Sequence, residues 1–331
     1  MRKVVAIMIV IIITIILVCF YNYNQKQKSI IVNNDAIVIE KECVGMKVTM
    51  FGGTNMLENG AAQCMGYYIR TKNGRNIIID GGYASDYELV KSYIDKYGNG
   101  KVDNWILTHG HRDHVGAFNE VIIKENTIEI ENLYYSFLED EWYKENDERG
   151  YDSEHLTLQN LSSPKIKNHV ECTEGKKINI DNIELEIIRI PNPEITDGDN
   201  GNEASMVFKL TATDVNKSMI FLGDAMGKAS VELLREHKEQ LKSEAVQMAH
   251  HGNWGVTEEV YKVINPQVAF FNAPKGLYDN DEGNGYNTGK FSSVQVRGWL
   301  EKIGVEKIFV AYEGEQTIHF NNEGIIKIKE N

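Results

Sequence analysis

Short apolar runs ended by glycine, asparagine or aspartate recur along most of the chain, and each has the length of a β-strand. In the first half they predict strands at 47–51, 66–71, 76–80 and 105–108. In the second half they predict strands at 177–180, 183–190, 205–210, 218–223, 246–248, 268–272, 307–312, 317–320 and 325–328. Two strand-rich halves of this kind are typical of a molecule built on two sheets.

Stretches with helical spacing lie between the predicted strands. In 85–97, one face of a helix would carry Tyr87, Val90, Tyr93 and Ile94. Further helices are predicted at 117–123, 229–241, 257–264 and 292–303. A helix with one apolar face packs that face on a sheet, so the pattern predicts an α/β fold in which two sheets lie between outer helices.

Three polar stretches are predicted as long loops, at 131–152, 191–204 and 275–290. Long loops on a compact scaffold are commonly functional or mobile. The first loop is acidic and aromatic, and it predicts a lid in which Trp142 and Tyr143 contact the substrate. Lys275, at the start of the third loop, is a further candidate for substrate binding. The alternative for the aromatic residues is that they only pack the loop onto the domain.

The amino-terminal residues have the pattern of a membrane anchor. An apolar run covers 4–20, follows Arg2 and Lys3, and precedes Tyr21 and Tyr23. We therefore expect a transmembrane signal anchor at 1–21, a polar stalk at 22–45 and the working domain at 46–331 on the extracytoplasmic side of the cell membrane. A cleaved signal peptide is the alternative, although small residues are missing near its cleavage position.

Composition and charge narrow the class of protein. A hydrophobic content of 42% and a charged content of 25% are ordinary for a globular protein of 331 residues. The net charge of −13 disfavours long nucleic acid as a partner and suits a small substrate better. The four cysteines have no C-x-x-C spacing, which argues against a thiolate zinc site. No protein partner is evident.

One short motif carries the chemistry. Directly after the apolar strand at 105–108, four side chains able to bind a metal lie within six residues: His109, His111, Asp113 and His114. Neutral imidazole and carboxylate are ligands that zinc prefers. Gly110 permits a turn between the first two histidines, so the spacing predicts a metal site in a loop at a strand end.

This H-x-H-x-D-H pattern resembles the signature of the metallo-β-lactamase superfamily. Three other features of that family are present in order, each at a predicted strand end: Asp80 before the motif, and Asp224 and the pair His250-His251 after it. The resemblance covers about 46–328. The variant is most similar to the hydrolase domain of ComEC-type competence proteins and to phosphorylcholine esterase.

The resemblance implies a metallo-β-lactamase αββα sandwich and a role for each residue. His109 and His111 would hold one metal ion, and Asp113 and His114 would hold the other together with His250. Asp224 would bridge the two ions. Asp80 would orient a ligand imidazole, and His251 would support the site from outside or exchange roles with His250. Asp113 is also the candidate catalytic residue.

One departure from the family pattern concerns the first metal. Many members have another histidine about twenty residues before the bridging aspartate, where this chain has Gly201-Asn202-Glu203-Ala204-Ser205. The His109/His111 ion would therefore lack one strong ligand. Asn202 is the candidate replacement, through its amide oxygen or a water, and a simple turn asparagine is the alternative.

The resemblance implies a hydrolase with two divalent ions, Zn²⁺ or alternatively Mn²⁺, that cleaves a phosphodiester or similar small anionic ester. Such a site needs no protein nucleophile, and the chain has neither a Gly-x-Ser-x-Gly motif nor a phosphate loop. A mononuclear iron dioxygenase of the same fold, a lactone or thioester hydrolase, and a non-catalytic binding module are the alternatives.

Overall fold

The computed structural model describes residues 28–33, 36–41, 44–52 and 65–328. The chain divides into two compact units, Met1–Val44 and Gly45–Asn331. The expected membrane segment at 4–20 lies outside the described residues. Among the helices that are described, none has the length and apolar character needed to cross a membrane.

In the first unit, two strands occur where the sequence suggests only a polar stalk. β1 (Lys28–Asn33) and β2 (Ala36–Lys41) pair antiparallel, with Ile30 opposite Ile39. Both strands are rich in isoleucine and valine, which favour extended backbone, and the sequence between them is of turn type. The hairpin follows from this local pattern.

The second unit contains an eight-stranded sheet in the order β17-β16-β3-β4-β5-β6-β7-β8. Neighbours from β17 to β5 are antiparallel, and β5 to β8 run parallel. The bounds are β3 (Met46–Met50), β4 (Gly66–Arg70), β5 (Asn76–Asp80), β6 (Lys101–Ile106), β7 (Glu129–Tyr135), β8 (Ile166–Glu171), β16 (Gln316–Asn321) and β17 (Gly324–Ile328).

A seven-stranded sheet faces it, in the order β15-β14-β13-β12-β11-β10-β9. Neighbours from β9 to β12 are antiparallel, and β12 to β15 run parallel. The bounds are β9 (Lys177–Ile180), β10 (Ile183–Arg189), β11 (Val207–Ala212), β12 (Lys217–Phe221), β13 (Ala245–Gln247), β14 (Val268–Phe271) and β15 (Lys307–Val310).

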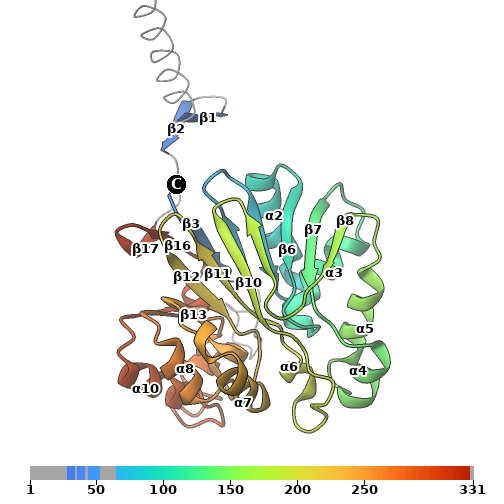
Figure 1. Cartoon of the computed structure of the whole chain (residues 1–331), viewed down its shortest axis with the longest axis vertical. Helices are drawn as coiled ribbons and strands as arrows, with labels where there is room; N and C mark the ends of the chain where they lie inside the picture. Colours follow the sequence, from blue (N-terminus) through green and yellow to red (C-terminus); the bar gives the residue numbers. More distant parts are fainter. Residues whose placement is uncertain (1–27, 34–35, 42–43, 53–64, 329–331) are drawn as a thin grey trace, which may run out of the picture. The chain divides into compact units, whose positions relative to one another are not determined.

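Helices cover the outer faces of both sheets, so the unit has four layers (Figure 1). The central core lies between the sheets and includes Ile79 and Phe221. A second core joins α7, α8 and α10 to the seven-stranded sheet, and a third joins α2 and α3 to the other sheet. The expected mixed α/β sandwich is confirmed. The helix bounds are α2 (Tyr87–Gly98), α3 (Arg112–Ile123), α4 (Asp140–Asn146), α5 (Tyr151–Asn160), α6 (Asn200–Glu203), α7 (Gly227–Glu236), α8 (Glu258–Ile264), α9 (Lys275–Tyr278) and α10 (Ser293–Ile303).

Helix α3 begins inside the metal motif, five residues before the predicted start. His111 is extended, and its carbonyl accepts hydrogen bonds from the amides of His114 and Val115. Asp113 therefore lies in the first helical turn, where a carboxylate interacts favourably with the helix dipole. The early start places Asp113 and His114 on a rigid element rather than on a loop.

The stretch predicted as an aromatic loop at 131–152 is mostly regular structure. It contains the end of β7, all of α4 and the start of α5. The prediction was wrong because Tyr143 is fully buried, so the aromatic residues fold the segment instead of leaving it open. We call the segment from α4 to α5, residues 140–160, the insertion.

Candidate metal centre

The metal-binding side chains come from the carboxyl ends of strands in both sheets. Asp80 is the last residue of β5, and the H-x-H-x-D-H motif follows β6. Asp224 follows β12, and His251 follows β13. Strand ends are where open α/β sheets commonly bind ligands.

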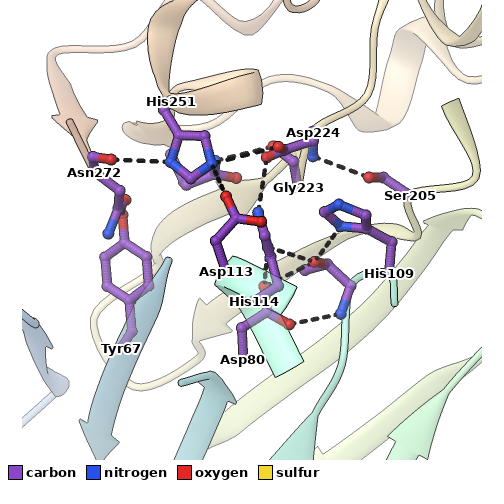
Figure 2. Close-up of polar contacts among 12 residues, drawn as sticks. Tyr67, Asp80, His109, Asp113, His114, Ser205, Gly223, Asp224, His251 and Asn272 are labelled. Carbon is purple, nitrogen blue, oxygen red and sulfur yellow. Dashed lines mark hydrogen bonds and ion pairs between the residues drawn. The ribbon is translucent and has the colours of Figure 1, made fainter. Parts of the chain in front are cut away.

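Four of these side chains converge on one point (Figure 2): Asp113, His114, Asp224 and His251. His114 Nε2 lies 3.2 Å from Asp224 Oδ1, and His251 Nε2 lies 3.2 Å from Asp113 Oδ2 and 3.4 Å from Asp224 Oδ2. Two ligands at about 2.0–2.1 Å from one tetrahedral ion would be separated by about 3.3–3.4 Å. The observed spacings match that value.

The donor atoms at this point are buried but make no hydrogen bond within the described part of the chain. They include Nε2 of His114, Nε2 of His251 and Oδ1 of Asp224. Leaving several such atoms unpaired would be costly, because a buried polar group needs a partner. A divalent cation satisfies all of them, so the residues fit a metal ion.

The opposite ring nitrogens are fixed by hydrogen bonds. His114 Nδ1 lies 2.8 Å from Asp80 Oδ2, and His251 Nδ1 lies 2.9 Å from the carbonyl oxygen of Asn272. Asp80 also accepts hydrogen bonds from the amide and hydroxyl of Thr108. An N–H donated to each oxygen leaves Nε2 with its lone pair directed at the cluster, which is the usual support for metal-binding histidine.

His109 and His111 lie beside this cluster. The His109 ring centre is 4.1 Å from that of His114 and 4.7 Å from that of His111. His109 Nδ1 is 3.1 Å from Thr108 Oγ1, while its Nε2 is buried and unpaired within the described residues. His109 and His111 therefore offer further imidazole nitrogens directly beside the ligand cluster, where a second ion would bind.

The charge states of His109 and Asp224 suit metal binding. Burial, followed by the nearby imidazoles of His114 and His111, holds the pKa of His109 well below its usual range, so the ring is neutral. Burial alone would raise the pKa of Asp224, but His114 and His251 outweigh it and hold that pKa well below its ordinary value. A neutral imidazole and an ionised carboxylate are the forms that coordinate metals.

The structure exchanges the roles that the sequence assigns to the paired histidines. His251, not His250, joins Asp113, His114 and Asp224. Both residues have left-handed backbone angles, with φ of 49° at His250 and 56° at His251, so the chain turns sharply and separates the two rings. His250 lines the neighbouring cleft, with its Nε2 3.4 Å from Asn202 Nδ2.

Asn202, the candidate replacement for the missing histidine, lies on α6 and lines the same cleft. Its Oδ1 is buried and makes no hydrogen bond within the described residues. The side chain therefore offers an unpaired oxygen in the cleft that the metal donors line, although it makes no hydrogen bond with His109 or His111.

A cleft of about 870 Å³ opens over the donors. Among its lining residues are Asp113, Asp224, Arg112 and Arg149. Neither arginine side chain has an ion-pair or hydrogen-bond partner among the described residues, so both charges are available to a ligand. The volume lies in the range of small-molecule sites.

The three residues expected to bind substrate do not line this cleft. Trp142 donates its indole N–H to the carbonyl of Pro193, and the hydroxyl of the buried Tyr143 accepts from the amide of Leu138. Lys275, the first residue of α9, pairs with Asp279, which immediately follows that helix. The residue types suggested contact with substrate, but Trp142 and Tyr143 hold their own segment in place and Lys275 forms a local ion pair.

The insertion contributes residues that sequence reasoning missed. His111 Nε2 lies 2.7 Å from Asp147 Oδ2 and 3.9 Å from Glu154 Oε1. Burial, followed by the charge of Asp147, raises the pKa of Glu154 to about 9. No sequence signal pointed to these two carboxyl groups, because each stands in an acidic stretch whose other members are solvent-exposed.

Comparison with known proteins agrees with this geometry. The family model of the metallo-beta-lactamase superfamily matches residues 59–264, which is more than half of the chain, so the chain belongs to this superfamily. The matched range contains the H-x-H-x-D-H motif, Asp224 and His251. Together with the clustered donors, this makes the protein a metal-dependent hydrolase with residues consistent with a dinuclear site.

The chain is similar to several solved structures at low sequence identity. The metallo-beta-lactamase fold protein YhfI from Bacillus subtilis is 12% identical, with 81% of this chain and 98% of that chain covered and a TM-score of 0.48. Yeast PDE1 is 9% identical, with 83% and 99% covered and a TM-score of 0.47. A diphosphatase from the PhnP family is 11% identical, with 86% and 98% covered and a TM-score of 0.45. No curated protein sequence matches the chain.

Proposed function

We propose that the protein is a dinuclear metallohydrolase that cleaves a small anionic ester, with a phosphodiester as the substrate class. The observation that carries this proposal is the pair Arg112 and Arg149 beside the metal donors. In a chain with a net charge of −13, two unpaired arginines beside the metal donors favour an anion in this cleft, whose lining also contains Glu120, Asp152 and Asp199. Arginine matches phosphate oxygens with two parallel hydrogen bonds.

The size of the cleft supports a small substrate. A volume of about 870 Å³ suits a ligand of drug-like size. The acidic surface opposes the binding of a long polyanion, which would meet many carboxylates outside the cleft. The motif resemblance to ComEC-type hydrolase domains and phosphorylcholine esterase favours phosphoesters over lactones and thioesters.

Each residue then has a chemical role in the proposed reaction. Two divalent ions, with Zn²⁺ proposed and Mn²⁺ the alternative, would supply a water that ionises near neutral pH and a Lewis acid for the scissile group. Asp113, which lines the cleft, is the carboxylate placed to accept a proton from the attacking water. Arg112 and Arg149 would hold the anionic group, and because water is the attacking group, no nucleophilic side chain is needed.

Replacing either arginine tests the substrate class. Arg149→Met should raise the KM for a phosphodiester about tenfold or more, a loss of ~1.4 kcal/mol, and leave the KM for a neutral ester unchanged. Steady-state kinetics on both substrates, with metal content checked in each preparation, measures the difference. Arg235→Met on α7 removes the same charge outside the cleft, where Arg235 pairs with Glu236, and serves as the control. Equal KM changes for both substrates would contradict the proposal.

We also propose that the amino terminus anchors the protein in the cell membrane, with the catalytic unit outside the cytoplasm. The apolar run at 4–20 after Arg2 and Lys3 supports this orientation. Protease added to intact cells that express the chain should digest the catalytic unit. A catalytic unit protected until the cells are lysed would reverse the topology.

A further inference from the structure

Three side chains form a buried cluster on the side of His111 that faces the insertion. Asp147 immediately follows α4, Glu154 belongs to α5, and His111 precedes α3. Glu154 is fully buried and Asp147 is 7% exposed. Acidic groups this deeply buried in a protein are uncommon, so the cluster requires an explanation.

The distances within the cluster indicate a hydrogen bond rather than a shared ion. His111 Nε2 and Asp147 Oδ2 are 2.7 Å apart, which is a charge-assisted hydrogen-bond length. In the neighbouring ligand cluster, nitrogens and carboxylate oxygens are 3.2–3.4 Å apart. A tetrahedral ion between Asp147 and His111 would need this longer spacing of about 3.3 Å.

His111, His114 and His251 each use one ring nitrogen for a hydrogen bond to an oxygen and leave the other ring nitrogen for a metal ion. His114 bonds Asp80 and His251 bonds the Asn272 carbonyl through Nδ1, and both leave Nε2 for the ions. His111 uses Nε2 for its carboxylate partner, which leaves Nδ1 as the nitrogen available to a metal. Asp147 therefore has the same relation to His111 as Asp80 has to His114.

Glycines from separate segments make room for this contact. A methyl group at Gly201 of α6 would lie 1.8 Å from Asp147 Oδ2 and 2.4 Å from His111 Nε2. One at Gly150 would lie 2.4 Å from the same carboxylate oxygen, and one at Gly110 would lie 2.6 Å from Glu154 Cγ. Real Cβ atoms do not approach other atoms so closely, so only glycine at these positions lets the backbone lie against the cluster.

The insertion is also fixed to the wall of the cleft, which holds Asp147 in place. The Asp147 amide donates to the carbonyl of Tyr143, and its Oδ1 accepts from the amide of Gly150. Asn200 on α6 donates to the carbonyl of Asn146. The Asp147 carboxylate is therefore fixed by the Gly150 amide, and the backbone that carries it is fixed by Tyr143 and by α6.

We propose that Asp147 is a positioning residue that orients His111 for the first metal ion, so that the insertion is a support of the metal centre. This proposal rests on the dinuclear site of the proposed function and deepens it. It assigns to the insertion a role in binding one ion, at the His109/His111 site that lacks the family's additional histidine. Outer partners of this kind change metal affinity by about 10–100-fold when removed.

Metal titration of the full chain tests the proposal without reference to any substrate. Asp147→Ala should weaken one of two Zn²⁺ binding steps by about 10–100-fold and leave the other unchanged. Asp147→Asn keeps an oxygen acceptor and should retain part of the affinity. Asp140→Ala is the matched control, since Asp140 Oδ1 lies 2.7 Å from His155 Nδ1 in the same insertion but outside the cleft. Wild-type affinity at both steps in Asp147→Ala would overturn the proposal, as would equal weakening of both.

A second variant leaves every polar group in place. Gly201→Ala should displace Asp147 and weaken the same binding step, with the fold checked by circular dichroism. In the Co²⁺-substituted protein, one exchangeable imidazole N–H resonance should broaden or vanish in both variants, while those of the other ligand histidines remain. A lower coordination number in Asp147→Ala would make Asp147 a ligand and overturn the positioning role. Absence of phosphodiesterase activity would affect only the proposed substrate.

Discussion

Replacing His251 by alanine should remove one of two metal ions from the protein, whereas His250→Ala should leave both bound. His251 Nε2 lies within 3.4 Å of two carboxylates in the ligand cluster, while His250 faces the cleft beside Asn202. Loss of a ligand atom should weaken binding at that step by more than about 100-fold, beyond the range for an outer partner. Elemental analysis after dialysis against a weak chelator measures the number of ions retained.

The rate of hydrolysis should fall in the variant that loses the ion. His250→Ala is a close control because the two histidines are adjacent in the chain. His251→Ala should lose well over nine-tenths of kcat, a barrier increase of more than ~1.4 kcal/mol. If His250→Ala lost the ion and His251→Ala kept it, the assignment of the paired histidines would be the one that the sequence alone suggests.

Replacing Gly116 by alanine should cause the largest loss of stability among the glycine variants of the outer helices. A methyl group there would lie 2.3 Å from the amide nitrogen of Ala84 and 2.6 Å from the carbonyl carbon of Tyr83, both backbone atoms that have little freedom to move. Overpacking of this kind costs about 3 kcal/mol at the upper end of its usual range. Thermal unfolding should shift down by about 6–12 °C for a unit of this size.

The matched control is Gly298→Ala, at a helical position of α10 where a methyl group meets no atom within 4 Å. Alanine favours a helix over glycine by about 1 kcal/mol, so this variant should unfold at a slightly higher temperature. Equal melting temperatures in the two variants would mean that α3 can move away from the segment at Tyr83 and Ala84, and that the first turn holding Asp113 is less rigid than described.

Strands with strong local patterns were predictable from the sequence, and boundaries set by tertiary contacts were not. Asn76–Asp80 is a run of three isoleucines between a turn and two glycines, and its predicted bounds are those of β5. The start of α3 was missed because glycine and histidine disfavour a helix locally, while backbone hydrogen bonds from Gly82 to His114 and from Ala117 to Gly82 hold this segment in place. The insertion was predicted as a loop because its sequence is acidic, and the burial of Tyr143 that folds it cannot be read from composition.

The site shows the same division. The H-x-H-x-D-H spacing is local, so its donors could be named from the sequence. The contact of Asp147 with His111 joins residues separated by 36 positions, and composition carries no signal for such a pairing. The choice between His250 and His251 depends on two consecutive left-handed backbone angles, and positive φ is uncommon in any residue other than glycine.

The placement of the last two strands has a consequence for biosynthesis. β16 pairs with β3, so residues at the carboxyl end complete a sheet that begins near Met46. Until those residues leave the ribosome, β3 has one open edge, and open edges recruit other strands. Such a long-range closure is slow because the loop entropy is lost before the contacts form. The nascent chain is therefore more exposed to aggregation until β16 has been synthesised and has paired with β3.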